Sequence, residues 1–204
     1  MGTILKEYRY TPTKIKRGYS GKSLYLNLTD LRFEQKEITD FMKEKLTGGK
    51  GFDLWYLWHA ITPETRWDSP ENEIVMSVGP LGGITQYSGT GKTVICSISP
   101  LTDIPIDSNV GGYFGPLLKF SGWDAFEIQG KSEKEILIFI DGNNGLIQVE
   151  DASEYPEDTH LLAEELTKKY AEDEDDMVNV SVACTGSGAK HSYMAMVNFS
   201  FYDP

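Results

Sequence analysis

Hydrophobic and polar positions alternate in short runs along most of the chain, which is typical of β-strands with one buried face. Residues 23–29 carry leucine at every second position, and residues 31–33 are expected to return beside them as a second strand. Further strands are predicted at residues 74–78, 93–98, 123–130, 136–140, 146–149, 178–183 and 192–197. Glycine and asparagine at residues 141–145 are expected to join two of these strands in a hairpin. The chain is therefore predicted to be rich in β-structure.

Four other segments follow the helical period. Apolar residues at positions 38, 41, 42 and 46 define one face of a helix that ends at Gly48 and Gly49. Residues 52–61 predict a second helix, whose aromatic side chains are expected in the core. Residues 117–120 predict a short helix that Gly122 ends, and residues 162–170 predict a helix with Asp158 or Thr159 as its N-cap.

The order of the predicted elements repeats. A hairpin, a helix, a strand that runs into a glycine loop and a further strand occur in residues 21–100 and again in residues 123–198. This order predicts an α+β fold, a duplicated β-rich domain of two mixed sheets related by a pseudo-twofold axis. Residues 1–20 form a basic N-terminal arm before the single domain of residues 21–204, and the arm is expected to pack either on that domain or on an acidic partner.

Composition narrows the functional classes. The 204 residues carry a net charge of −12, which argues against nucleic-acid binding because phosphate contacts need clustered lysine and arginine. No apolar run approaches the roughly 18 residues that a membrane span requires. The N-terminus carries no apolar core typical of a signal peptide. These features predict a cytoplasmic protein that binds neither membrane nor nucleic acid.

Cysteine and histidine give no metal motif. Cys96 and Cys184 lie in apolar runs far apart, and we expect both to be buried, reduced thiols. An iron–sulfur cluster normally takes four cysteine thiolates, so the two cysteines of this chain cannot supply a full set. The three histidines show no zinc-binding spacing. The residues alone identify no catalytic group.

Three glycine-rich segments are the candidates for ligand binding. Residues 86–93 resemble a phosphate-binding P-loop, but Gln86 replaces the first glycine and a strand is predicted where the P-loop needs a helix, so ATP binding is not expected. Backbone N–H groups and one lysine there can still bind phosphate. The alternative is that these segments are plain structural turns. The candidate residues are Gly89, Gly91, Lys92, Asn109, Gly111, Gly112, Gly186 and Gly188.

Several short motifs occur in a fixed order along the chain. They are Gly48-Gly49-Lys50-Gly51, Ser69-Pro70-Glu71-Asn72, Gly79-Pro80-Leu81, Ser99-Pro100-Leu101-Thr102, Asn109-x-Gly111-Gly112-Tyr113-Phe114-Gly115, Leu118-Lys119-Phe120-x-Gly122-Trp123-Asp124, Gly130-Lys131 and Asp151-Ala152-Ser153. Together they resemble the N-terminal domain of tungsten-containing aldehyde ferredoxin oxidoreductases, over residues 21–198. The resemblance implies a duplicated two-sheet base on which a tungsten–bis-pterin cofactor lies, in agreement with the repeat.

The resemblance also assigns roles to particular positions. Asn109 and the glycines after it match the segment beside the pterins, where Asn109 would serve the magnesium that bridges their phosphates. Lys92 stands where the family usually has a pterin-contacting arginine, and lysine lacks the bidentate fork of arginine. Asn198 matches the asparagine before a second pterin loop, but residues 199–204 depart from the glycine-rich pattern of that loop. The cluster cysteines and the later domains of the family are not part of this sequence.

Two functions are therefore open. The first is the cofactor-base domain or small subunit of an aldehyde ferredoxin oxidoreductase-type enzyme, an oxidoreductase that converts an aldehyde to an acid at tungsten. The second is a non-catalytic, degenerate relative that acts as an assembly, pterin-carrying or structural partner of a full-length oxidoreductase, or that associates with itself. The departure at residues 199–204 favours the second and suggests a natural short protein. In both cases we expect a larger oxidoreductase subunit or a second copy as partner, with Phe199, Phe201 and Tyr202 adding to the contact surface.

Overall fold

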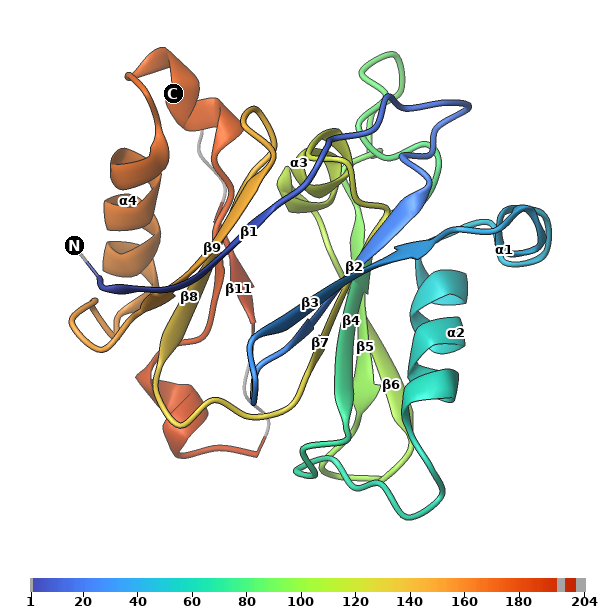
Figure 1. The fold of residues 1–204 in the computed structure, drawn as a ribbon, viewed down its shortest axis with the longest axis horizontal. Helices are drawn as coiled ribbons and strands as arrows, with labels where there is room; N and C mark the ends of the chain where they lie inside the picture. The colour runs from blue at the N-terminus through green and yellow to red at the C-terminus, as the bar shows by residue number, and fades with distance from the viewer. Residues whose placement is uncertain (1, 194–196, 201–204) are drawn as a thin grey trace.

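The computed structural model describes residues 2–193 and 197–200 of the 204-residue chain. Within these residues the strands form a six-stranded sheet, a three-stranded sheet and a two-stranded pair (Figure 1). Helices accompany the sheets but do not alternate regularly with the strands. The fold is therefore α+β, as the sequence predicts.

The six-stranded sheet is mixed. Its strands in spatial order are β3 (Arg32–Glu37), β2 (Lys22–Asn27), β7 (Ala125–Gln129), β4 (Glu73–Ser77), β5 (Thr93–Ile98) and β6 (Pro105–Val110). Strands β2 and β7 pair in parallel, and the other neighbours pair antiparallel. Because β7 lies between β2 and β4, a strand from the middle of the chain completes a sheet begun near the N-terminus.

The three-stranded sheet is antiparallel and consists of β1 (Ile4–Arg9), β9 (Leu146–Asp151) and β8 (Ile136–Asp141) in that order. The two-stranded pair consists of β10 (Ala183–Cys184) and β11 (Asn198–Phe199). The first strand belongs to the basic N-terminal arm. This part of the arm therefore packs on its own domain, which is one of the two alternatives that the sequence leaves open.

The helices are α1 (Asp40–Lys45), α2 (Lys50–Ala60), α3 (Phe114–Phe120) and α4 (Thr159–Tyr170), with two 3₁₀ helices, η1 (Asp175–Asn179) and η2 (Ser187–Lys190). The Thr39 side chain accepts the N–H of Met42 and so caps α1. The Asp158 side chain accepts two N–H groups at the start of α4 and caps that helix. No helix within the described ranges is long and apolar enough to cross a membrane.

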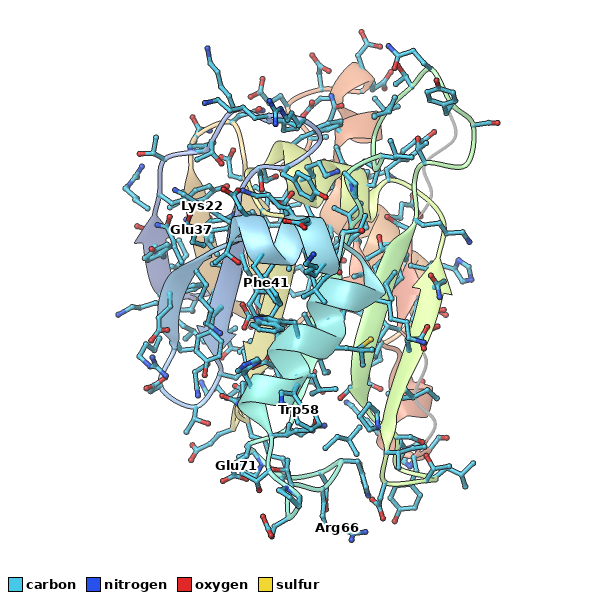
Figure 2. All side chains as sticks on the ribbon, turned by 90° about the vertical axis from the view of Figure 1, so that its right-hand side faces the viewer. Lys22, Glu37, Phe41, Trp58, Arg66 and Glu71 are labelled. Carbon is cyan, nitrogen blue, oxygen red and sulfur yellow. The ribbon has the colours of Figure 1, made fainter. Side chains whose placement is uncertain are left out.

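Two hydrophobic cores lie on opposite faces of the large sheet. Leu24 and Leu26 of β2 point into the core shared with the three-stranded sheet, where Trp123 is fully buried. The other core lies under α1 and α2 and includes Phe52 and Leu57. The outer side of this helix pair remains exposed, with Trp58 79% accessible (Figure 2). The large sheet is therefore covered on both faces.

Most predicted elements are confirmed. The predicted strands at residues 74–78, 93–98, 123–130, 136–140 and 146–149 correspond to β4, β5, β7, β8 and β9, and the first hairpin corresponds to β2 and β3. The four predicted helices correspond to α1, α2, α3 and α4. Three of the described strands, β1, β6 and β11, were not predicted.

The strand predicted at residues 178–183 is wrong over most of its length, because Val178 and Asn179 end η1 and the strand β10 begins at residue 183. Asp176 accepts a hydrogen bond from the Asn179 side chain, and its own N–H donates to Asp173 Oδ1, both at 2.9 Å. Such local bonds favour a turn over a ladder. Residues 192, 193 and 197 form no strand, and the rest of the predicted last strand, residues 194–196, lies outside the described residues.

The described residues do not show the predicted pseudo-twofold repeat. The two parts of the chain contribute unequally, because β7 joins the sheet of the first part while β8 and β9 pair with β1 instead. The order of elements along a chain does not determine which strands pair. The architecture is therefore a large mixed sheet with a smaller antiparallel sheet packed against one face.

Candidate functional site

Loop residues 89–92 lead directly into β5. The first strand residue is Thr93, so the lysine of the P-loop-like motif is followed by a strand and not by the helix that nucleotide binding requires. Lys92 is exposed, and no heavy atom lies within 4 Å of the position that a Cβ would take on Gly89. The loop therefore presents accessible backbone and one cation at the end of the large sheet.

A second loop meets the first at the same end. Asn109 lies near the end of β6, opposite Val94 of β5. Gly111 and Gly112 come directly after the last residue of this strand. A Cβ on Gly91 would lie 2.3 Å from the carbonyl oxygen of Gly112. Only glycine allows this close approach. The structure thus brings together six of the eight predicted residues, those of loops 89–92 and 109–112.

The third glycine segment lies elsewhere. Ser187 of η2 donates its N–H to the carbonyl oxygen of Glu157 at 3.1 Å, and a Cβ on Gly186 would lie 2.9 Å from Thr159 Cγ2. In Figure 1 this segment is at the lower left, whereas the loop before β5 is at the top of the large sheet. Gly186 and Gly188 are therefore not brought together with the other six residues.

The segment that does reach the paired loops comes from the end of the described chain. The carbonyl oxygen of Ser200 lies 3.9 Å from the Cβ position of Gly112, and the rings of Phe199 and Phe114 are in edge contact at 5.1 Å. Val182 donates its N–H to Ser200 Oγ at 2.8 Å, which fixes this segment beside β10. The sequence signal for this contact was Asn198, which matches the asparagine before the second pterin loop of the family. Phe201 and Tyr202, predicted to add to a contact surface, lie outside the described residues.

The charges around the paired loops favour an anion more than the net charge suggests. The carboxylate of Asp107, two residues before Asn109, lies 2.6 Å from Lys50 Nζ and also accepts from the Asn109 side chain at 3.4 Å. Lys50 therefore offsets the negative charge nearest to Asn109, while Lys92 stays exposed. Backbone N–H groups of glycine segments supply further positive potential for a phosphate.

The donors at this site suit phosphate and a hard cation. The space beyond Gly89 and Gly111 is open, so a ligand can approach their backbone closely. The side-chain oxygen of Asn109 and backbone carbonyls are ligands that magnesium accepts, usually together with water and phosphate oxygens. In the part of the chain that the structure describes, no group of three or more His, Cys, Asp or Glu side chains could hold a metal by itself. Both cysteines are free; Cys96 is buried as predicted, whereas Cys184 is partly exposed.

A second polar cluster lies between α2 and the large sheet, and sequence reasoning missed it. Glu127 of β7 is fully buried and accepts hydrogen bonds from Ser23 Oγ at 2.6 Å and from Lys36 Nζ. Glu73 of β4 lies diagonally across from Glu127, is 1% exposed, and leaves Oε1 without a partner. Burial, and then the charge of Glu127, raise the pKa of Glu73 to about 8. Tyr56 of α2 completes the cluster, with its buried hydroxyl also unpartnered.

The arrangement of sheets and loops is shared with a protein of known structure. A chain of the active-site complex BamBC of benzoyl coenzyme A reductase, in complex with 1,5 dienoyl-CoA, superposes with a TM-score of 0.80 at 27% sequence identity. The match covers 89% of this chain and 27% of that chain. The class that the fold defines is thus an α+β domain that forms one part of a larger polypeptide in its structural relative.

The family follows from the sequence comparison. The family model of the aldehyde ferredoxin oxidoreductase N-terminal domain matches residues 23–203, and this chain belongs to that family. The tungsten-containing aldehyde ferredoxin oxidoreductase of Pyrococcus horikoshii is 34% identical over 160 residues, which are 76% of this chain and 26% of that relative. The aliphatic sulfonate oxidoreductase WOR-like subunit of Pyrococcus furiosus is 31% identical over 140 residues, 67% of this chain and 22% of that relative. The chain spans about a quarter of the length of these curated relatives, and the resemblance found in the sequence motifs is confirmed.

Proposed function

We propose that this chain is the cofactor-base part of an aldehyde ferredoxin oxidoreductase-type enzyme and that it holds the phosphate end of a tungsten–bis-pterin cofactor. The observation that carries the proposal is the contact between Gly91 and Gly112, which joins two glycine loops at one end of the large sheet. Lys92 and Asn109 stand on these two loops. The choice of a tungsten cofactor is supported by membership in a family that has tungsten-containing relatives.

Each residue has a separate task in this proposal. Backbone N–H groups of Gly89, Gly91 and Gly111 bind phosphate oxygens, and Lys92 supplies the cationic side chain. Asn109 offers its side-chain oxygen to a magnesium ion that bridges the phosphates. Gly186 and Gly188 take no part, because they lie at another place in the fold. When bound, tungsten supplies the two-electron redox chemistry, and this chain contributes binding and orientation.

Titration of a pterin phosphate into the purified protein tests the site. Lys92→Ala is expected to weaken binding by about 1–3 kcal/mol, the usual range for the loss of a charged hydrogen-bond partner. Asn109→Ala is expected to weaken binding only when magnesium is present. Lys168→Ala, on α4, removes an exposed lysine away from the loops and should leave the affinity unchanged. Equal affinity in all four proteins, or no binding to the wild type, would reject the site.

The alternative function is a non-catalytic relative that acts with a larger oxidoreductase subunit or with a second copy of itself. Its support is the cysteine count: two thiols cannot ligate an iron–sulfur cluster that takes four. The purified chain is then expected to oxidise no aldehyde with viologen dyes as electron acceptors. Metal analysis combined with pterin fluorescence on the native protein separates the two functions, because stoichiometric tungsten together with turnover by this polypeptide alone would exclude the alternative.

A further inference from the structure

Lys119, in the last turn of α3, is a buried cation that donates its hydrogen bonds to a glycine turn. Its side chain is 1% exposed, and fully buried lysines are rare unless they are paired. Its Nζ donates to the carbonyl oxygens of Gly79, at 2.5 Å, and Gly82, at 3.3 Å. Burial lowers the pKa of Lys119 to about 8, while the nearby charge of Asp124 opposes this shift. The ammonium therefore stabilises the turn that contains Gly79 and Gly82.

This turn connects to the proposed phosphate site by consecutive hydrogen bonds. Gly82 donates its N–H to the carbonyl oxygen of Gly79 at 2.9 Å, which closes the turn. Gly83, the next residue, donates to the carbonyl oxygen of Thr90 at 3.1 Å, and Thr90 Oγ1 donates back to the carbonyl oxygen of Ile84 at 2.9 Å. Thr90 is followed by Gly91, whose close approach to Gly112 joins the two loops. The position of the turn thus determines where residues 89–92 lie.

The helix that carries Lys119 touches the same loop at a second point. A Cβ on Gly115, in the first turn of α3, would lie 2.7 Å from Thr93 Oγ1 and 3.3 Å from the carbonyl oxygen of Lys92. Helix α3 therefore contacts the loop of residues 89–92 directly at its end, at Lys92. It is also linked to the start of this loop indirectly, through Lys119 and the turn of residues 79–83. Loop residues between these two points are held at both ends by one rigid element.

We infer that Lys119 is a positioning residue for the anion site: its ammonium holds the glycine turn at residues 79–83 and thereby sets the path of residues 89–92. This inference rests on the proposed function, since it assigns a task to a residue behind the same site. Lys119 does not touch the ligand. Its protonated form is the active one, so the site is ordered below a pH of about 8 and loosens as Lys119 loses its proton.

Two measurements on the full chain test this role. Sulfate is the probe, because it keeps its charge between pH 6 and 10 and so reports titration of the protein alone. Lys119→Met is expected to increase amide hydrogen exchange in residues 79–92 at least tenfold while the β2 and β7 amides keep their protection. Its sulfate affinity should fall about tenfold. In the wild type, affinity should decline as pH rises through about 8, and this step should be absent in the variant.

Leu118→Ala is the matched control, because Leu118 is buried on the same helix but donates nothing to the turn. It should lower the melting temperature and leave the sulfate affinity and its pH dependence as in the wild type. Equal effects of Lys119→Met and Leu118→Ala on affinity and exchange would show a merely structural role and overturn the inference. If the wild type binds no sulfate, the proposed site fails, and unchanged loop exchange in Lys119→Met would then overturn the positioning role separately.

Discussion

Buried Glu73 should make the stability of this protein depend on pH in a direction opposite to that of an ordinary surface carboxylate. Burial and the charge of Glu127 raise its pKa from 4.5 to about 8. Lys36 donates to Glu127, which leaves the proton of the pair on Glu73. Folding therefore favours the protonated acid. The contribution of Glu73 is fully present below pH 4.5 and is lost as pH rises to about 8.

The size of this effect follows from the shift itself. Each pH unit between the two pKa values costs about 1.4 kcal/mol, so the unfolding free energy should lose about 4 kcal/mol from pH 4.5 to pH 8. For a domain of this length each kcal/mol moves the melting temperature by about 2–4 °C, which gives about 8–16 °C in total. Glu73→Gln replaces the protonated acid by a neutral side chain of similar shape and should remove this dependence.

The assay is urea unfolding of wild type and Glu73→Gln at half-unit steps from pH 4.5 to pH 8.5. The quantity to compare is the difference between the two unfolding free energies, because groups common to both proteins cancel. Asp53 and Asp124 also have raised pKa values and shape both curves alike. Glu127 interacts with the charge of Glu73, so any change in its titration is part of the measured difference. Glu71→Gln, at the exposed end of the preceding loop, is the control and should run parallel to the wild type (Figure 2). Parallel curves for Glu73→Gln as well would refute the buried, protonated Glu73.

Two further predictions address the loops. The buried carboxylate of Asp124 accepts the N–H groups of Ser20 at 2.9 Å and Gly21 at 2.7 Å, so Asp124→Asn should cost about 1.5–3 kcal/mol in urea unfolding. An unchanged midpoint would show that these bonds contribute nothing net. Gly91→Ala places a methyl group against the Gly112 carbonyl and should abolish sulfate binding in calorimetry, whereas Gly111→Ala, which meets open space, should keep the fold and the loop contact. Binding by Gly91→Ala equal to that of the wild type would contradict the proposed meeting of the loops.

The sequence predicted the elements that bury a regular pattern and missed those that do not. Strand β2 was predicted because its leucines alternate, and both Leu24 and Leu26 are fully buried. Strand β6 escaped because it is an edge strand, with Ile106 exposed and mostly polar neighbours. Strand β1 was not predicted because charged residues occupy half of its positions and because its partner, β9, is distant in the sequence. Pairing with a distant strand, which holds β1 beside β9, leaves no local pattern in the sequence, whereas β6 pairs with β5, the strand directly before it in the chain.

The candidate site likewise has features that the sequence indicated and features that it did not. Glycine spacing and family motifs mark loops 89–92 and 109–112 as candidate binding segments, and this much could be predicted. The separate location of Gly186 could not, since it depends on which strands of the two sheets pair. The Glu73 and Glu127 pair also carried no signal. Two isolated glutamates 54 positions apart become neighbours only through the register of β4 against β7.

The parallel pairing of β2 with β7 has a consequence for how the chain can be made and divided. Ser23 and Ala125, which face each other in this pair, are 102 positions apart. In a nascent chain that has not reached residue 129, the leucine face of the β2–β3 hairpin is uncovered because β7 is not yet complete. The partner of β1, strand β9, is synthesised later still. Folding must therefore come late in translation, with long-range closure as the slow step. A gene split between residues 100 and 123 would yield two fragments that each lack a central partner strand, so neither is expected to fold until both are present together.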